Sequence, residues 1–417
     1  MTTTKTTGNN DRRRVLIVVE NLSVPFDRRV WRECGALREA GYDVSVISPM
    51  GVGTDSKPRE MVDGVSIYRY RGFQSGGGFV SYVLEYSVAL VMSFWLMIVA
   101  ALREGFDVIQ ICNPPDLLIL PTLPFKLIGK KVIFDQHDLC PEIYQVQKSV
   151  GSRNFVVTVL RFCERMTYFF ADVVMVVNES CRKIALGRGG QKPEDVFVVR
   201  NGPSQQNIRD AAPNPALKQG KRHLLSYVGM MGPQEGIDGL LRAIRILSTV
   251  HGRDDFHVRI MGSGTVLNDM KQNARELGLQ GIVTFTGHVD YRQVMEGIAS
   301  ADVCLCPDPK TELSDKCSLV KAIEYMSLGR PFVAFDLEEV RLSAADAAVY
   351  ALPNSEEDFA EKIDYLLDHE ELRDTMGKVG KERVAEFLTW EHSKDALYGA
   401  YAKIFEKKTG AIGQVAK

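Results

Sequence analysis

Short runs of apolar residues alternate with helical stretches along this chain, and this alternation constrains the fold more than any other feature. In the first half the runs are rich in Val and Ile, as in residues 15–20 (VLIVVE) and 131–136 (KVIFDQ). Such runs are typical of strands buried on both faces of a parallel sheet. The stretch Val30–Ala40 between them has helical character and ends at Gly41, a usual helix stop. The alternation predicts an α/β fold. The other expected strands of this half are residues 43–48, 65–70, 107–112, 172–177 and 196–201.

The second half repeats the pattern after a segment rich in Pro, Gln and Asn at 203–220, which reads as a linker. A chain of 417 residues suits two domains of about 200 residues each. We therefore predict two Rossmann-like, doubly wound domains facing across a cleft, at residues 1–203 and 204–386. A last helix at 387–408 is expected to pack back on the first domain. Expected strands of the second half are 224–229, 257–262, 282–287, 302–307 and 331–336, and expected helices are 239–250, 266–277, 291–299 and 319–328.

Composition excludes several classes of protein. The formal net charge is −2, with no basic stripe of the kind that binds nucleic acid. Eight scattered cysteines include no C-x-x-C pair, so we expect free thiols in a reducing compartment. The first residues, MTTTKTTGNNDRRR, are basic but no apolar segment of a signal peptide follows them. The expected location is the cytoplasm.

Residues Tyr86–Leu102 form a run of 17 residues without a charge. A helix that spans a membrane needs about 20 apolar residues. Because another strand of the same domain follows, spanning would separate that strand from its sheet. We expect a domain helix that is buried or faces a membrane. Arg69, Arg71 and Phe94 nearby are compatible with peripheral contact at the anionic inner face of the cell membrane. An ordinary buried helix remains the alternative.

Ligands of doubly wound sheets bind beyond the carboxyl ends of strands, so the residues just after each strand are candidates. After the first strand, Asp27, Arg28 and Arg29 open a helix. Two arginines at the positive end of a helix dipole are unusual and indicate recognition of an anion such as a phosphate. The alternative is a solvated turn in which Asp27 caps the helix. The dinucleotide pattern G-x-G-x-x-G is missing here.

A polar cluster follows the strand at 131–136 and begins with His137. A histidine at this position could hydrogen-bond a sugar hydroxyl or move a proton. The alternative is a histidine whose hydrogen bonds are satisfied within the domain.

Two glycine-containing loops in the second half each follow a strand and precede a helix. They contain Gly229 with Gly232, and Gly262 with Ser263. Glycine allows backbone N–H groups to approach a phosphate closely at a helix N-terminus. Tight turns also use glycine, so either loop alone is weak evidence.

The strongest candidate site follows the expected strand 302–307. Its polar residues are Asp315, Lys316, Ser318, Lys321 and Glu324, and the last two lie off the apolar stripe of the expected helix. A helix that opens with Ser and Asp residues directs free N–H groups toward a ligand. A carboxylate further along that helix can accept hydrogen bonds from a vicinal diol such as that of ribose. The alternative is a plain solvated helix surface.

With these motifs in view, the chain resembles bacterial retaining glycosyltransferases of family four, which have the glycosyltransferase-B fold. The resemblance covers about residues 14–405. It depends on short motifs at Val199–Gly202 (VRNG), Gly262–Gly264 (GSG), Leu277–Leu279 (LGL), Phe285–Gly287 (FTG), Ala301–Val303 (ADV) and Ala322–Pro331 (AIEYMSLGRP).

The resemblance implies transfer of a sugar from a nucleotide-sugar donor, held by the second domain, to an acceptor hydroxyl held by the first. His137 would contact the donor sugar and Glu324 would bind the ribose. No metal cofactor is implied. We expect a lipid-linked glycan of cell-surface polysaccharide synthesis as the acceptor.

The chain departs from the family pattern at three positions. The arginine and lysine that usually hold the diphosphate correspond to Met230 and Glu235, and the first glutamate of the family's pair corresponds to Lys316. We hypothesise that Lys316, with Lys321, replaces the missing phosphate contact, and that Asp315 takes the sugar-binding role. His137, Asp315 and Lys316 are then the expected catalytic residues. A non-catalytic partner subunit remains an alternative, and a sugar-nucleotide 2-epimerase is a weaker one.

Overall fold

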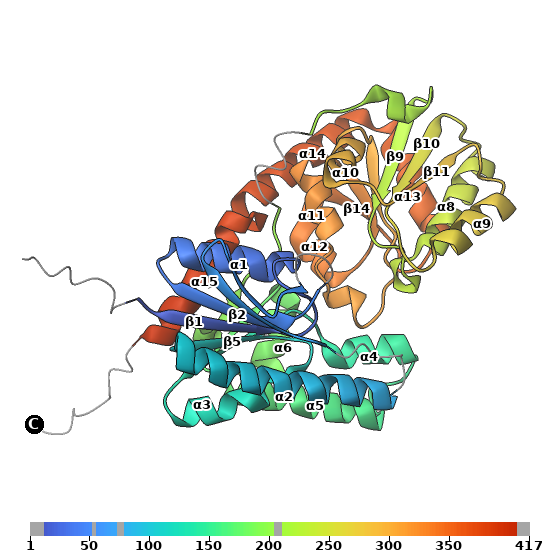
Figure 1. Ribbon diagram of the computed structural model, residues 1–417. Coiled ribbons are helices and arrows are strands. Elements are labelled where there is room, and N and C mark those ends of the chain that lie inside the picture. Colours follow the sequence, from blue (N-terminus) through green and yellow to red (C-terminus); the bar gives the residue numbers. More distant parts are fainter. Residues whose placement is uncertain (1–11, 52–55, 73–78, 204–210, 407–417) are drawn as a thin grey trace, which may run out of the picture. The chain divides into compact units, whose positions relative to one another are not determined.

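A computed structural model of the chain describes residues 12–51, 56–72, 79–203 and 211–406. Internal contacts divide the chain into two units (Figure 1). Unit 1 comprises Met1–Val177, Cys181–Val199 and Lys394–Lys417, and unit 2 comprises Asn178–Ser180 and Arg200–Ser393. The chain therefore passes from unit 1 to the main part of unit 2 between residues 199 and 200, a few residues before the predicted domain boundary.

Unit 1 contains a sheet of eight strands in the order β3-β4-β2-β1-β5-β6-β7-β8. All neighbours are parallel except β3, which pairs antiparallel with β4. The prediction of a doubly wound sheet is confirmed, but β3 was not predicted, because REMV is a short and partly exposed edge strand. The strands are β1 (Arg14–Val19), β2 (Asp43–Pro49), β3 (Arg59–Val62), β4 (Val65–Tyr70), β5 (Val108–Cys112), β6 (Lys131–Gln136), β7 (Val173–Val176) and β8 (Val196–Val198).

Helices cover both faces of this sheet, with α1 and α15 on one face and α2, α3 and α5 on the other (Figure 1). The last helix begins after a π-helical turn, η8 (Val384–Leu388), so it starts later than predicted. Its Tyr398 hydroxyl donates to the carbonyl of Ala36, and its Tyr401 hydroxyl donates to Gln110. The helices are α1 (Arg28–Glu39), α2 (Phe79–Arg103), the 3₁₀ segment η2 (Asp116–Thr122), α3 (Leu123–Leu127), α4 (Cys140–Lys148), α5 (Phe155–Phe170), α6 (Glu179–Gly187) and α15 (Trp390–Phe405).

Unit 2 contains a parallel sheet of six strands in the order β11-β10-β9-β12-β13-β14. Two apolar clusters pack against it, one with α8 and α13 and the other with α10, α11 and α12. The short strand β14 (AVYA) was not predicted. The elements are β9 (His223–Val228), α8 (Ile237–Thr249), β10 (Phe256–Met261), α9 (Leu267–Glu276), β11 (Val283–Gly287), α10 (Tyr291–Ala299), β12 (Val303–Cys306), α11 (Val320–Ser327), β13 (Phe332–Phe335), α12 (Glu338–Ala344), β14 (Ala348–Ala351), α13 (Glu356–Asp368) and α14 (Glu370–Arg383).

Each sheet changes its winding direction at one place, which locates the expected ligand site of each unit. In unit 1 the change lies between β1 and β5, and in unit 2 it lies between β9 and β12. The segments that follow these strands are residues 20–27 and 113–115 in unit 1, and residues 229–236 and 307–319 in unit 2. Candidate residues at these segments are therefore well placed to contact a ligand.

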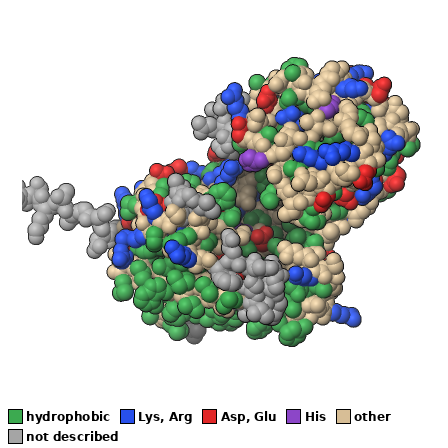
Figure 2. All heavy atoms as spheres, turned by 45° about the vertical axis from the view of Figure 1, so that its right-hand side comes forward, with side chains coloured by type: hydrophobic (Ala, Val, Ile, Leu, Met, Phe, Trp, Pro, Cys, Tyr) green, Lys and Arg blue, Asp and Glu red, His purple; other side chains and the backbone are tan. Residues whose placement is uncertain are grey.

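Helix α2 contains a stretch, Leu84–Arg103, that is long and apolar enough to cross a membrane by length and composition, although one such helix is weak evidence. One of its faces packs on the sheet, where Ala89, Ser93 and Met97 are almost completely buried. Other apolar side chains of α2 are exposed, and hydrophobic side chains gather over the lower left of the view in Figure 2. Hence α2 is a domain helix with one buried and one exposed apolar face.

A buried carboxyl group lies beside the winding change of unit 1. Asp116 begins η2 just after β5 and is 4% exposed. Its Oδ1 accepts a hydrogen bond of 2.8 Å from Asn113. Burial, aided by the nearby charge of Glu164, raises the pKa of Asp116 to about 7. The folded protein therefore favours the protonated acid.

We predict that Asp116→Asn changes the pH dependence of stability. In the unfolded chain an aspartate has a pKa of about 3.9, so the folded acid binds its proton more tightly. The contribution of this tighter proton binding to the free energy of unfolding is fully present below about pH 4. It is lost as pH rises through about 7, at up to about 1.4 kcal/mol for each pH unit. Asparagine cannot ionise, so the variant should gain stability relative to the wild type between pH 5 and pH 7.5. Urea denaturation measures this difference. The exposed Asp254→Asn is the control, and a difference from wild type that is independent of pH would contradict the prediction.

Candidate functional site

The loop that carries His137 is held in place by one buried side chain, Asn113. This residue follows β5 and is 2% exposed. Its Oδ1 accepts hydrogen bonds from the backbone N–H groups of His137 (2.7 Å) and Asp138 (3.1 Å). Its Nδ2 donates to the carbonyl of Asp138 (2.8 Å). Sequence analysis did not single out Asn113; its position directly after a strand at the winding change was the available signal.

The imidazole of His137 is paired with a buried carboxylate. Its side chain is 16% exposed, and its Nε2 lies 2.7 Å from Oδ2 of Asp135 and 3.1 Å from Nε of Arg29. The short contact with a carboxylate requires a proton between the two atoms, so we assign Nε2–H as the donor to Asp135. Burial lowers the pKa of His137, but the charge of Asp135 and this hydrogen bond raise it more, and the net pKa is raised. A substrate would therefore meet Nδ1.

Arg29 does not present its charge to an external anion, which corrects the expected phosphate contact. Its side chain is 6% exposed, and Nη2 lies 2.7 Å from Oδ1 of Asp135. Nη1 donates to the carbonyl of Val199 at 2.7 Å, and Nε lies 3.1 Å from Oε1 of Glu33. Arg29 therefore compensates the buried charge of Asp135 within unit 1.

At the start of α1, the structure confirms the alternative prediction that Asp27 caps the helix. Oδ1 of Asp27 accepts hydrogen bonds from the backbone N–H groups of Arg29 and Val30, so Asp27 is the N-cap. Arg28 is exposed in the first turn. Of the two arginines, Arg28 alone keeps an exposed side chain, and its contact with an anion stays a prediction.

Among the described residues, Cys112, Asp135 and His137 place possible metal ligands within 4.8 Å of one another. The group does not fit a metal well. The guanidinium of Arg29 already contacts both Asp135 and His137, and its positive charge would repel a cation. Burial raises the pKa of the Cys112 thiol well above its usual range, which disfavours the thiolate that binds metals. We interpret the group as an ion-pair network.

Helix α11, which carries Glu324, is fixed at the winding change of unit 2 by Tyr325. The Tyr325 hydroxyl accepts a hydrogen bond from the backbone N–H of Val228 at the end of β9 and donates to the carbonyl of Leu305 in β12, both at 3.1 Å. The N-cap residue, Leu319, supplies no side-chain hydrogen bond to the first turn. Glu324 lies half-buried in the second turn. The helix start thus combines uncapped N–H groups with a carboxylate on one rigid element.

The expected helix 319–328 is confirmed to within one residue at each end, but Ser314 and Asp315 do not open it. The residues Ser314–Lys316 form a separate 3₁₀ turn, η6, and α11 begins only at Val320. Oδ1 of Asp315 accepts a hydrogen bond of 2.7 Å from the backbone N–H of Glu338 and lies 3.2 Å from Nζ of Lys310. Asp315 therefore helps to fix the start of α12, and only its other oxygen is left for the sugar contact that was expected.

Two further candidates precede α11: Lys316 ends η6, and Ser318 lies between η6 and α11. The backbone carbonyl of Lys316 and the hydroxyl of Ser318 both accept hydrogen bonds from Nδ2 of Asn178, at 2.8 and 3.0 Å. Both Lys316 and Ser318 are partly exposed. Their backbone positions are thus fixed, and their contact with a donor stays a prediction.

Lys321 is not a phosphate contact either, which corrects the second expected cation. The residue is 9% exposed, and its Nζ lies 2.8 Å from Asp308 and 2.9 Å from Glu235. The ammonium also lies 4.8 Å from the centre of the Tyr227 ring. Burial lowers the pKa of Lys321, but Asp308, Tyr227 and Glu235 together raise it more, so the ammonium stays charged. Lys321 neutralises the acidic residue that occupies the usual lysine position.

The two glycine-containing loops of unit 2 pack against each other. Gly262 has φ +140°, and a Cβ atom there would lie 1.9 Å from the carbonyl oxygen of Gly229. The backbone N–H of Met231 donates to the carbonyl of Ser263. The close contact of the loops is sufficient to explain glycine at 262, whereas a Cβ atom at 229 would lie 2.6 Å from the Tyr227 hydroxyl. The conformation of Gly232 has negative φ, and Ser263 is exposed.

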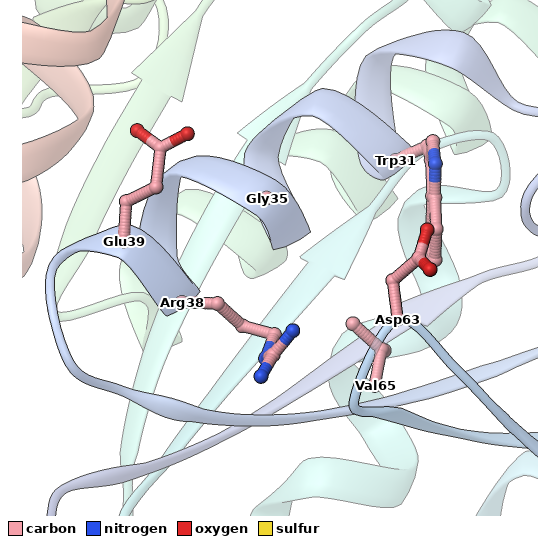
Figure 3. A pocket seen from close by; sticks show the side chains of 6 residues that line it. All are labelled: Trp31, Gly35, Arg38, Glu39, Asp63 and Val65. Atoms are coloured by element: carbon pink, nitrogen blue, oxygen red, sulfur yellow. The ribbon is translucent and has the colours of Figure 1, made fainter.

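Two surface cavities are lined by residues other than these candidates. A cavity of about 420 Å³ on unit 1 is lined by Trp31, Gly35, Arg38, Glu39, Asp63 and Val65, with the Asp63 carboxylate beside the Trp31 ring (Figure 3). A cavity of about 460 Å³ on unit 2 is lined by residues such as Ala211, Ser327, Arg330 and Lys381. Neither is lined by a predicted site residue.

Comparison with known families identifies the class of protein. Residues 27–204 match the family model described as Glycosyltransferase Family 4, and residues 208–383 match the model described as Glycosyl transferases group 1. Together these models cover both halves of the chain. Each half of the chain therefore matches a glycosyltransferase model, and the two doubly wound units share the glycosyltransferase-B fold.

Individual relatives are distant. An alpha-D-kanosaminyltransferase of Streptomyces kanamyceticus is 27% identical over 44% of this chain and 46% of its own. A D-inositol 3-phosphate glycosyltransferase of Corynebacterium aurimucosum is 24% identical over 58% of this chain and 59% of its own. The chain thus spans about half the length of the curated relatives it matches first.

Solved structures share the fold over almost the whole chain. Sucrose-phosphate synthase of Thermosynechococcus elongatus has a TM-score of 0.73 at 17% identity and covers 94% of this chain and 99% of its own. Anabaena HepE in complex with UDP has a TM-score of 0.67 at 13% identity (93% and 99% covered). WaaG, a glycosyltransferase involved in lipopolysaccharide biosynthesis, has a TM-score of 0.67 at 16% identity (92% and 98% covered).

We predict that Asp135→Asn lowers the pKa of His137. The variant removes the charge and the acceptor that raise this pKa and leaves the burial that lowers it. Histidine-selective NMR across pH 4–9, with the signal assigned from a His137→Ala variant, measures the change. Glu33→Gln is the matched control, because its charge raises the pKa of His137 less than that of Asp135 does. An unchanged pKa in Asp135→Asn would show that Asp135 does not set the protonation of His137.

Proposed function

We propose that this protein is a retaining glycosyltransferase that moves a sugar from a nucleotide-sugar donor to a hydroxyl of a lipid-linked glycan in cell-surface polysaccharide synthesis. One observation carries the proposal: α11 begins without a side-chain cap at the winding change of unit 2 and carries Glu324 in its second turn. This arrangement suits a nucleoside diphosphate, which has an anion at one end and a ribose diol at the other.

The leaving diphosphate gains negative charge as the sugar–phosphate bond breaks, and the start of α11 would stabilise that charge. Backbone N–H groups and the helix dipole favour an anion there and need no reorganisation during the reaction. Lys316 would add the positive charge that Met230 and Glu235 do not supply. Lys321 would act indirectly, because it neutralises Glu235 and Asp308 and so reduces their repulsion of the diphosphate.

Glu324 would hold the ribose of the donor through hydrogen bonds from its hydroxyl groups. On unit 1, His137 would orient the transferred sugar through Nδ1, while Asp135 and Asn113 hold the ring and its backbone. The related structure of HepE contains UDP, which supports a uridine nucleotide as the first donor to test.

The proposed acceptor follows from different observations. Helix α2 exposes an apolar face, and WaaG, which shares the fold, is described as acting in lipopolysaccharide biosynthesis. A cytoplasmic enzyme held peripherally at the inner face of the membrane could reach a glycan carried by a lipid.

We predict that donor affinity depends on Glu324 and Lys316. In Glu324→Ala the ribose loses its acceptor, and in Lys316→Ala the diphosphate loses a charge. Each loss should raise the donor dissociation constant by about 10- to 100-fold, equivalent to about 1–3 kcal/mol. Isothermal titration with the best ligand from a panel of UDP-, GDP- and TDP-sugars measures the change.

Lys378→Ala, an exposed lysine on α14, is the matched control and should leave the dissociation constant unchanged. An unchanged affinity in Lys316→Ala would remove the proposed phosphate role of that residue. Binding of no nucleotide sugar would favour the non-catalytic partner.

We also predict retention of anomeric configuration and independence from metal. The sequence offers no obvious enzyme nucleophile, so we expect attack of the acceptor hydroxyl on the same face that the diphosphate leaves. Product from an α-linked donor should be α-linked when its anomeric proton is examined by NMR. Because protein groups would neutralise the diphosphate, transfer should persist at its full rate in EDTA. A β-linked product or loss of transfer in EDTA would contradict the respective part of the proposal.

A further inference from the structure

Helix α2 exposes a continuous apolar stripe opposite the face that packs on the sheet. The exposed residues Leu84, Val91, Trp95 and Leu102 recur at intervals of seven, four and seven positions, which places them on one side of a helix. Trp95 is 59% exposed and Leu102 is 83% exposed. Burial of the opposite face against β2 and β4 keeps the helix in the domain.

Helix α5 repeats this arrangement, although sequence analysis did not single it out. Phe155, Val159, Phe162 and Phe169 are all exposed and share one face, whereas Glu164 and Tyr168 on the other face are fully buried. Phe155 and Phe169, near the two ends, are 79% and 78% exposed. Exposed phenylalanines at helical spacing are unusual on the surface of a protein that contacts only water.

The segment η2–α3 connects these two helices. It contacts both α2 and α5, and the ring of Phe125 in α3 lies 6.1 Å from that of Phe94 in α2. The same segment exposes Leu120, Leu127 and the adjoining Ile128. We call this combined surface of unit 1 the apolar face. It holds twelve of the 22 large hydrophobic side chains that are exposed in the described part of the chain.

The exposed charges on and beside the apolar face are basic. Arg103 ends α2, Arg153 precedes α5, and Arg165 lies on the exposed side of α5. The acidic residues of α2 and α5 are less accessible, since Glu164 is buried against Arg188 and Glu85 is partly buried. Arg69, expected at a lipid surface, is buried and lies 2.6 Å from Glu60. Of the two arginines predicted there, Arg69 is therefore not available to lipid, whereas Arg71 is exposed and its contact stays a prediction.

We infer that the apolar face docks on an anionic lipid bilayer, with the exposed sides of α2 and α5 lying in the interface and the three arginines contacting lipid headgroups. Apolar side chains, an interfacial tryptophan and basic residues at the margin are the combination that binds such a surface. Docking deepens the proposed function, on which it rests only for the expectation that the acceptor is carried by a lipid.

Two other ways of covering the face fit less well. A transmembrane orientation of α2 would require Met97 and its neighbours to leave the sheet, where they are almost fully buried. A twofold dimer through this face would bring two sets of Arg103, Arg153 and Arg165 into one interface without exposed acidic residues of α2 and α5 to pair with. A bilayer with anionic headgroups satisfies both the apolar and the basic residues.

Vesicle flotation of the full chain tests the inference without any donor. The protein should float with vesicles that contain about 30% phosphatidylglycerol and bind pure phosphatidylcholine more weakly. The double variant Trp95→Glu/Phe162→Glu should lose at least about tenfold in partition coefficient. Arg103→Gln/Arg165→Gln should lose the preference for anionic vesicles and keep the weaker binding to phosphatidylcholine.

Val250→Glu/Leu352→Glu is the matched control, because both residues are exposed apolar side chains of unit 2 and should leave flotation unchanged. In a Trp31→Phe/Trp390→Phe background, brominated lipids should quench the fluorescence of Trp95. Flotation of the Trp95→Glu/Phe162→Glu variant like the wild type, or absence of wild-type flotation, would overturn the inference. A stable dimer that Phe162→Glu dissociates would do so as well, because a second copy would then cover the face.

Donor titration without vesicles and flotation without donor keep the two proposals separable. A protein that floats but binds no nucleotide sugar would keep the docking face and lose the proposed transferase activity. Donor binding without flotation would leave the proposed function standing and would contradict membrane docking through the apolar face.

Discussion

The pairing of buried charge is the constraint on which both candidate sites depend. Asp135 is completely buried and keeps its charge because Arg29 and His137 surround it. Burial raises the pKa of Asp135, but Arg29 and His137 lower it by more, so the net pKa is lowered. In unit 2, Lys321 and Asp308 form an equivalent pair beside Glu235. Removing one partner of such a pair leaves a charge without compensation and costs about 3–5 kcal/mol. Arg29 and Lys321, which the sequence suggested as ligand contacts, therefore form ion pairs with buried carboxylates of the protein instead.

This constraint separates groups that can meet a substrate from groups that hold others in place. Asn113 fixes the backbone of His137, and Tyr325 fixes α11 on the strands at the winding change. The groups that the proposal assigns to substrate contact are Nδ1 of His137, the start of α11 and the half-buried Glu324. In both units, buried hydrogen-bonding residues hold the contact groups in place. A contact group that could move freely would not keep the orientation that binding requires.

Much of the fold could be predicted because the buried strands are local, continuous apolar runs. The expected strands matched the observed elements closely, and α10 has the predicted bounds. The edge strands β3 and β14 were missed because strands of four residues at an edge carry too few buried side chains to give a pattern. Ser314 and Asp315 were expected to open α11 but form a separate 3₁₀ turn, since Ser and Asp residues suit such a turn as well as a helix cap.

The sequence by itself determined the class of fold, the ends of strands at which sites occur, and the candidates His137 and Glu324, because these follow from local apolar patterns and from position after a strand. Only the tertiary structure decided that Arg29 and Lys321 point inward, that Asp315 caps the start of α12, and that α5 shares an apolar face with α2. The physical reason is that the environment of a charge or an exposed ring is set by side chains far away in the sequence. Asp135 lies 106 residues from Arg29, and no local pattern encodes that contact.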